Sequence, residues 1–244
     1  MFWKKKKEPS EPLNDLSLIG VDLHSHILPG LDDGSQEMYD TVHMLTGLKE
    51  LGYRKAIVTP HNQADFFENP SEKILAKLDE VRNHLAKIGF DFEIEAASEY
   101  YFDYKILENI RKKELLTFGD NYILFELSPT LPPMNFETIV FEMQMAGYRP
   151  VMAHPERYGY FHAPGKYREL TEKGIMMQIN IHSLSPTGPH QIRKAAENLI
   201  KDELVTFAGS DTHSYQNIEI MKRLLTNPHL IKLVNSGSLF NKDL

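Results

Sequence analysis

Histidine and carboxylate side chains recur along the chain in short polar clusters. His24 and His26 lie two residues apart in GVDLHSH, and Asp211 and His213 repeat that spacing in GSDTH. Residues i and i+2 of a strand point to the same face, so each pair can direct two ligand atoms at one ion. Imidazole with carboxylate suits Zn, Mn or Fe, and the chain contains no cysteine that would favour a softer metal. The two pairs therefore predict metal binding.

Seven short apolar runs are expected to form strands that would position these residues. They cover residues 20–26, 55–61, 92–98, 122–127, 149–155, 175–181 and 204–210. Helical patterns lie between them, at residues 37–51, 71–88, 136–146, 167–172, 189–200 and 218–225. This alternation of strand and helix predicts a parallel sheet or barrel in a single domain. In parallel barrels the active site forms where the strands reach their C-terminal ends.

The metal-capable side chains fall at those C-terminal strand ends. They are His24, His26, His61, Glu99, Glu126, His154, Asp211 and His213. The Asp32–Asp33 turn follows the first strand and can fold back over it. Each residue alone has an ordinary alternative role, such as capping a helix or pairing with an arginine, but buried strand ends rarely carry unpaired charge. Together the residues predict a site for several metal ions.

Composition limits the classes of partner. A formal net charge of −7 over 244 residues disfavours broad nucleic-acid binding. No apolar run is long enough to span a membrane, and MFWKKKKEPSEP lacks the apolar core of a secretory signal. We expect a basic, disordered tail at residues 1–17 and one domain at residues 18–244 of a cytoplasmic protein. Alternatively, Phe2, Trp3 and the lysines of the tail make weak contact with the inner face of the membrane.

Five blocks occur along the chain in a characteristic order: HSHILPGLDDGS, TPH, SEYY, AHPERY and GSDTH. Together they resemble the PHP (polymerase and histidinol phosphatase) superfamily. The first and fourth blocks resemble its manganese-dependent tyrosine-protein phosphatases from bacterial capsule and exopolysaccharide loci. The resemblance covers residues 20–215. It implies a distorted (β/α)7, TIM-like barrel that holds three divalent ions, Mn²⁺ first, with Fe or Zn as alternatives.

The resemblance also implies which residues bind each ion. The first ion takes His24, His26, Glu99 and Asp211. The second ion takes Glu99, Glu126 and His154. The third ion takes Asp33, His61 and His213. Asp33 is preferred to Asp32 because the family's ligand is the second acid before the glycine, and Glu95 is a weaker alternative to Glu99.

The implied activity is hydrolysis of phosphotyrosine. Clustered dications lower the pKa of a bound water, so a metal-bound hydroxide can attack phosphorus. Arg157 would hold the phosphate and stabilise the transition state, and its alternative is an ion pair with Glu156 or another acid. His182 is a candidate for the pocket wall. The candidates for an aromatic rim that binds the substrate are Tyr100, Tyr101 and Tyr158.

The implied substrate and partner is a tyrosine-phosphorylated bacterial kinase that controls capsule and exopolysaccharide synthesis. The alternatives are a small-molecule phosphatase of the histidinol-phosphate type and an inactive, metal-bound module that binds phosphotyrosine. One position departs from the family, which commonly has a phosphate-binding arginine several residues after the last block. Ile218 stands near that place here. Lys222 and Arg223 are candidate replacements, although a helix would turn both toward solvent.

Overall fold

Strands and helices alternate along residues 11–244, the part of the chain that the computed structural model describes. The strands are β1 (Val21–Leu23), β2 (Lys55–Val58), β3 (His61–Asn62), β4 (Glu93–Ala96), β5 (Glu99–Tyr101), β6 (Tyr122–Glu126), β7 (Arg149–Ala153), β8 (Met176–Asn180) and β9 (Phe207–Gly209). The α-helices are α1 (Met38–Glu50), α2 (Ser71–Lys87), α3 (Tyr104–Lys112), α4 (Phe136–Met145), α5 (Lys166–Glu172), α6 (His190–Lys201), α7 (Tyr215–Arg223) and α8 (Pro228–Asn235).

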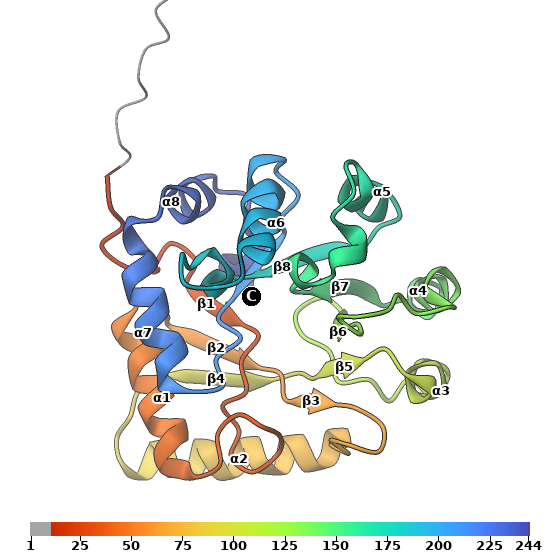
Figure 1. The fold of residues 1–244 in the computed structure, drawn as a ribbon. Coiled ribbons are helices and arrows are strands. Elements are labelled where there is room, and N and C mark those ends of the chain that lie inside the picture. The colour runs from red at the N-terminus through yellow and green to blue at the C-terminus, as the bar shows by residue number, and fades with distance from the viewer. Residues whose placement is uncertain (1–10) are drawn as a thin grey trace, which may run out of the picture.

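The strands form a parallel wall that curls round on itself. One sheet has the order β1-β2-β4 and the other the order β3-β5-β6-β7-β8-β9. Ser25 and Thr212 form a parallel bridge just beyond β1 and β9, which joins the two sheets on one side. On the other side, the N–H of Glu99 donates to the carbonyl of Pro60 at 3.1 Å. Figure 1 shows the helices around the outside of the strands. The expected single-domain, TIM-like α/β fold is confirmed.

Two of the seven predicted strand runs correspond to two short strands each. The run at 55–61 contains β2 and β3, which are separated by Thr59 and Pro60. Proline has no N–H to donate to a neighbouring strand, so the ladder is interrupted there. The run at 92–98 contains β4, and β5 begins one residue beyond it. The interruptions leave seven strand positions around the barrel and carry His61 and Glu99 onto short strands of their own.

The six predicted helices are present, with ends within three residues of those expected. Two further helices, α3 and α8, were not predicted. Each begins at a capping side chain: Asp103 accepts the N–H of Lys105, and Asn227 accepts the N–H of His229. An Asp or Asn before a helical pattern is a recognised N-terminal signal, strengthened in α8 by Pro228 at its first position.

Strand side chains alternate between two apolar layers. Val151 and Ala153 of β7 belong to a cluster inside the barrel, together with Leu124 of β6. Met152 and Phe125 of the same strands belong to the larger cluster between strands and helices. This is the two-residue period of an extended chain. The interior of the barrel is therefore apolar, and the polar side chains lie at the ends of the strands.

The folded domain begins before residue 18. Leu16 is fully buried, and its N–H donates to the carbonyl of Leu51 at 2.7 Å. The N–H of Leu13 likewise donates to the carbonyl of Leu225 at 2.9 Å. The expected disordered tail is therefore wrong for residues 13–17, and the predicted membrane contact of Phe2 and Trp3 lies outside the described residues. Within residues 11–244, no helix is long and apolar enough to cross a bilayer.

Candidate metal centre

Three of the candidate ligands have a left-handed backbone. The φ angles are 88° at His24, 34° at His154 and 47° at Asp211. Val21 and Leu23 point into the barrel, so strict alternation would turn His24 outward, toward the helices. The left-handed residue breaks that alternation and brings the imidazole to the mouth of the barrel. A non-glycine residue in this region costs about 1–3 kcal/mol and is typical of functional sites.

The first predicted ligand group is brought together at the barrel mouth. Nε2 of His24 lies 3.1 Å from Oε2 of Glu99 and 3.4 Å from Oδ1 of Asp211. Nε2 of His26 lies 3.3 Å and 3.4 Å from the same two oxygens. All four residues are buried. Both Nε2 atoms and Oε2 of Glu99 have no hydrogen-bond partner among the described residues. Lone pairs that converge without hydrogen bonding one another suit a shared cation.

The second predicted group shares Glu99 with the first. Its Oε1 lies 2.9 Å from Nε2 of His154, which is 3.9 Å from Oε2 of Glu126. Nδ1 of His61 lies 3.1 Å from both Glu99 and Glu126. Glu99 therefore lies at the centre of the cluster, with one carboxylate oxygen near His24, His26 and His61 and the other near His154. The alternative, Glu95, points elsewhere and pairs with Lys55 at 2.7 Å.

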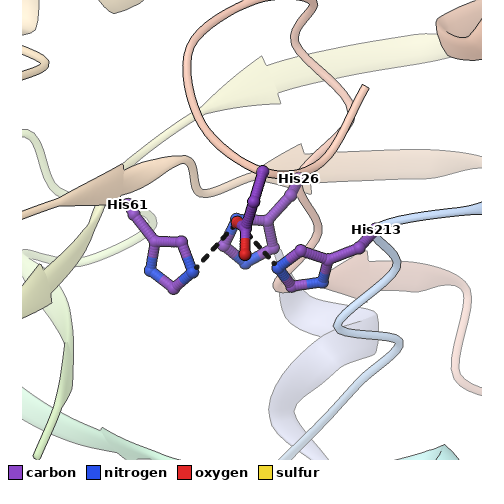
Figure 2. A group of neighbouring side chains, drawn as sticks. His26, His61 and His213 are labelled. Atoms are coloured by element: carbon purple, nitrogen blue, oxygen red, sulfur yellow. Dashed lines mark ion pairs between the residues drawn. The ribbon is translucent and has the colours of Figure 1, made fainter. Parts of the chain in front are cut away.

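The third predicted group lies on the outer side of the cluster. Oδ1 of Asp33 is 3.6 Å from Nε2 of His61 and 3.4 Å from Nε2 of His213. Figure 2 shows the rings of His61 and His213 on either side of His26. His26 joins these three in one potential ligand group. Asp32 lies behind His26 instead, with Oδ2 2.8 Å from Nδ1 of that ring. All nine predicted ligands thus belong to one connected cluster.

Further polar side chains hold the candidate ligands from behind. Oε1 of Gln178 lies 2.8 Å from Nδ1 of His24, and the amide of Asn180 donates to Oδ2 of Asp211 at 2.7 Å. A partner at one ring nitrogen fixes the orientation of the other, which improves a metal ligand. Gln178 and Asn180 were not predicted. The sequence does contain a pattern that could have identified them, because they are the only two polar residues of the apolar run IMMQINI and lie two positions apart.

Electrostatics within the cluster are dominated by the carboxylates. Burial and the charge of His26 lower the pKa of His61, but Glu99 and Glu126 outweigh them and raise it to about 10. Burial raises the pKa of Glu99, but the charges of His24 and His61 hold it well below its usual range. Burial also raises the pKa of Asp211, but the charge of His24 and the hydrogen bond from His26 hold it well below its usual range. Such concentrated negative charge favours cations, and a dication can replace the protons on the imidazoles.

Arg157 extends over the cluster from the turn after β7. Its Nη1 lies 3.7 Å from Oδ2 of Asp211. Glu156 is fully buried and accepts the N–H of Asn180 at 2.9 Å, so it is not the partner of Arg157. A cavity of about 480 Å³ opens here. Its lining includes Asp33, His61, Gln63, Phe67, Tyr101, Glu126, His154, Arg157, His182, Asp211, His213 and Asn217.

The predicted aromatic rim is wrong at two of its three positions. Tyr158 and Tyr100 are only 1% and 3% exposed, and each hydroxyl accepts a backbone N–H. Tyr101 does line the cavity, and so does Phe67, which was not predicted. The ring of Phe67 stacks on His61 with centroids 5.5 Å apart. Burial of Tyr100 and Tyr158 depends on packing between distant segments, which sequence spacing does not reveal.

Neither candidate replacement for the family's second arginine lines the cavity. Lys222 pairs with Glu50 and Glu219, each at 3.0 Å, and Arg223 is exposed on the last turn of α7. Ile218 is fully buried. His182 and Asn217 lie in the cavity instead. Arg157 is therefore the only lysine or arginine among the residues that line it.

The order of motifs around this cluster matches a known family model. Residues 20–223 fit the model described as "Capsular polysaccharide synthesis, CpsB/CapC". The chain belongs to the CpsB/CapC family. It is 30% identical to tyrosine-protein phosphatase YwqE of Bacillus subtilis over 196 residues, which cover 80% of this chain and 77% of YwqE. It is 31% identical to tyrosine-protein phosphatase CpsB of Streptococcus pneumoniae over 201 residues, 80% of this chain and 83% of CpsB.

Solved structures agree with this CpsB/CapC assignment. A chain from the crystal structures of YwqE and CpsB, described as metal-dependent tyrosine phosphatases, matches with a TM-score of 0.75 and 27% identity. The match covers 88% of this chain and 94% of that one. A zinc-bound histidinol phosphate phosphatase from Lactococcus lactis matches with a TM-score of 0.51 and 14% identity, which reflects the fold alone. The resemblance to capsule-locus tyrosine phosphatases is confirmed.

Proposed function

We propose that this member of the CpsB/CapC family is a metal-dependent protein-tyrosine phosphatase that uses Arg157 to hold the phosphate. The observation that carries the proposal is the position of the Arg157 guanidinium, in the cavity that six of the nine candidate ligands line. Relatives named as tyrosine-protein phosphatases match 80% of the chain. They support this activity over a histidinol-phosphate phosphatase.

The residues present fit three divalent ions, for which Mn²⁺ is our first choice and Fe or Zn the alternatives. Three sets would hold the ions: His24, His26, Glu99 and Asp211; Glu99, Glu126 and His154; Asp33, His61 and His213. Support comes from the buried, unpartnered Nε2 atoms of His24 and His26 and from Oε2 of Glu99. When bound, the ions supply Lewis acidity, which activates water near neutral pH and offsets charge on the phosphoryl group.

The side chains of the cavity bind and orient the substrate. Arg157 presents a planar set of donors to the phosphate oxygens and offsets the charge that develops on them. Asp211 holds the guanidinium over the cluster at 3.7 Å. Oδ1 of Asn217 accepts the N–H of His213, so its amide nitrogen is the group that can donate to phosphate. A phenolate, with a pKa near 10, leaves without strong acid catalysis.

Phe67 and Tyr101 are the side chains that we propose contact the aryl ring of the substrate. Both line the cavity, and Phe67 lies against His61. The backbone of Phe67 is fixed by a bridge to Gln63, with N–H to carbonyl distances of 3.0 Å in both directions. A flat ring packed on aromatic faces gains contact that an alkyl phosphate cannot make. This arrangement favours phosphotyrosine over phosphoserine.

The substrate we propose is the tyrosine-phosphorylated tail of a bacterial kinase that controls capsule or exopolysaccharide synthesis. The description of the family, capsular polysaccharide synthesis, supports this partner. A kinase that uses cytoplasmic ATP would place the phosphatase in the cytoplasm.

The test compares phosphate release from a phosphotyrosine peptide and from histidinol phosphate by the full, Mn²⁺-loaded chain. We expect a higher kcat/KM on the peptide. Histidinol phosphate as the better substrate would replace our proposal with a small-molecule phosphatase. Peptide binding without phosphate release would indicate an inactive binding module. The variant His26→Ala should lose bound metal and activity together, because both Nε2 contacts of that ring lie inside the first ligand group.

A further inference from the structure

We infer that a second surface beside the candidate metal centre binds apolar residues that flank the phosphotyrosine of the substrate peptide. The inference rests on the proposed function and deepens it. The surface, here called the flanking groove, has a volume of about 450 Å³. Its lining includes Pro132, Pro133, Met134, Thr138, Tyr160 and Lys166.

The flanking groove lies at the same end of the barrel as the metal centre. Residues 127–135 leave the C-terminal end of β6 directly after Glu126 and lead into α4. Residues 155–165 leave the C-terminal end of β7 directly after His154 and lead into α5. These two connections form most of the groove, and Figure 1 shows α4 and α5 side by side beyond β6 and β7. In parallel barrels these connections surround the active site.

A short series of contacts joins the groove to the ligands. The hydroxyl of Tyr160 donates to the carbonyl of Ser128 at 2.7 Å, which ties the two connections together. The ring of Tyr160 stacks on Tyr158 with centroids 5.9 Å apart. Tyr158 in turn lies 3.2 Å from Nδ1 of His154. One buried side chain, Tyr158, therefore separates Tyr160 of the groove from His154 of the cluster, so the groove adjoins the candidate metal centre.

Apolar side chains near the groove are unusually exposed. Met134 is fully exposed and Leu131 is 72% exposed, in a loop that also contains three prolines. Phe141 and Met145 are exposed on α4. Thr138, Phe141 and Met145 follow helical spacing along one face of α4, and Met134 lies in the turn just before that helix. Exposed apolar patches of this kind mark interaction sites on soluble proteins.

The charges of the groove favour an apolar occupant. Lys166 pairs with Glu169 at 2.9 Å, and Glu137 pairs with Lys173. Both charged side chains are therefore engaged with neighbours, and the proline and aromatic surfaces remain for contact. Proline and aromatic rings pack well against aliphatic or aromatic side chains. The geometry assigns the groove to a peptide whose residues near the phosphotyrosine are apolar, and not to an acidic or basic flank.

The experiment measures KM for a phosphotyrosine peptide with apolar flanks and for p-nitrophenyl phosphate, which has no flanks. In the variants Leu131→Asp and Met134→Asp we expect KM for the peptide to rise about tenfold, since one buried aliphatic side chain contributes at least that factor. The kcat and KM for p-nitrophenyl phosphate should stay at the wild-type values. Leu18→Asp is the matched control, because Leu18 is 63% exposed just before β1, at the opposite end of the barrel.

For a peptide with glycine in place of its apolar flanks, we expect the wild type to show a KM about as high as the variants show for the apolar peptide. The variants should raise the KM for the glycine peptide little further. An unchanged KM for the apolar peptide in both variants would refute the groove. An equal rise in KM for p-nitrophenyl phosphate would also refute it. If the variants changed the oligomeric state and left KM unchanged, a second copy of the chain, and not the peptide, would cover this face. If the wild type hydrolysed neither substrate, the proposed activity would fail instead, and peptide affinity by fluorescence anisotropy would still test the groove with the same variants.

Discussion

The hydroxyl of Tyr158 lies 3.2 Å from Nδ1 of His154, on the opposite side of the ring from the Nε2 that faces Glu99 at 2.9 Å. The same hydroxyl accepts the N–H of Leu127, at the end of β6. Burial and the charge of Glu126 raise the pKa of Tyr158 well above its usual range, so its hydroxyl stays neutral. Tyr158 is thus a positioning residue for a candidate ligand and not part of a substrate rim.

The variant Tyr158→Phe should weaken metal binding about tenfold, because loss of a partner behind a ligating histidine typically costs that much. Isothermal titration of metal-free protein with Mn²⁺ measures the effect. Tyr167→Phe is the matched control: Tyr167 is also a buried tyrosine, but its hydroxyl donates to the carbonyl of Pro155 and not to a candidate ligand. Equal Mn²⁺ affinities in both variants would show that Tyr158 has only a packing role.

Substitution of Arg157 should separate phosphate binding from metal binding. Arg157→Ala should lower kcat/KM on a phosphotyrosine peptide about 10²–10³-fold, which is the usual effect of removing one donor that stabilises developing charge. Arg157→Lys should recover part of the loss, because lysine keeps the charge but not the planar set of donors. Metal content by mass spectrometry should match the wild type in both. Loss of metal in Arg157→Ala would assign Arg157 to the structure of the site and not to the phosphate.

Metal affinity should increase with pH. In the metal-free cluster the carboxylates raise the pKa of His61 to about 10, so this ring is protonated at pH 7. A dication displaces that proton, and binding is therefore easier when fewer protons must leave. The Kd for Mn²⁺ should be lower at pH 7.5 than at pH 6.5, with proton release detected in buffers of different ionisation enthalpy. A Kd independent of pH would contradict this arrangement of charges.

Removal of the ions should also destabilise the fold. A ligand at one hundred times its Kd adds about 2.7 kcal/mol to the free energy of unfolding when it binds only the native state. We expect chelation to lower Tm and to abolish phosphatase activity, and Mn²⁺ to restore both. Activity that survives complete chelation, verified by metal analysis, would refute the metal-dependent mechanism.

Ile218 should be coupled to Gly47 of α1. A Cβ added at Gly47 would lie 2.8 Å from both Cδ1 and Cγ2 of Ile218. Overpacking in Gly47→Ala should cost about 1–3 kcal/mol, and the gain in helix propensity offsets about 1 kcal/mol of it, so we expect a net destabilisation of up to about 2 kcal/mol. Urea denaturation of Gly47→Ala, Ile218→Val and the double variant measures the coupling. We expect the double variant to lose less unfolding free energy than the two single variants lose together. Additive losses would mean that α1 and α7 move apart to accommodate the added methyl group.

The same contact explains why an arginine does not fit at position 218 in this chain. Ile218 is fully buried on the inner face of α7, against α1. An arginine there would have to bury its charge or push the two helices apart. Phosphate binding in the cavity therefore depends on Arg157 as the cationic group, and His182 and Asn217 are further polar side chains available to the phosphate.

The sequence by itself determined the alternation of strands with six of the eight helices, and it placed eight of the nine candidate ligands at strand ends, because these follow from local periodicity and residue type. The resemblance of its motifs to the PHP superfamily added the barrel class and the choice of Asp33. Only the tertiary structure decided how those residues face one another. The left-handed φ of His24 turns its side chain inward against the two-residue period, and no local signal announces it. Packing between distant segments buries Tyr100 and Tyr158 and leaves Phe67 and Tyr101 in the cavity. Burial depends on what the rest of the chain places beside a residue, so spacing along one strand does not determine it.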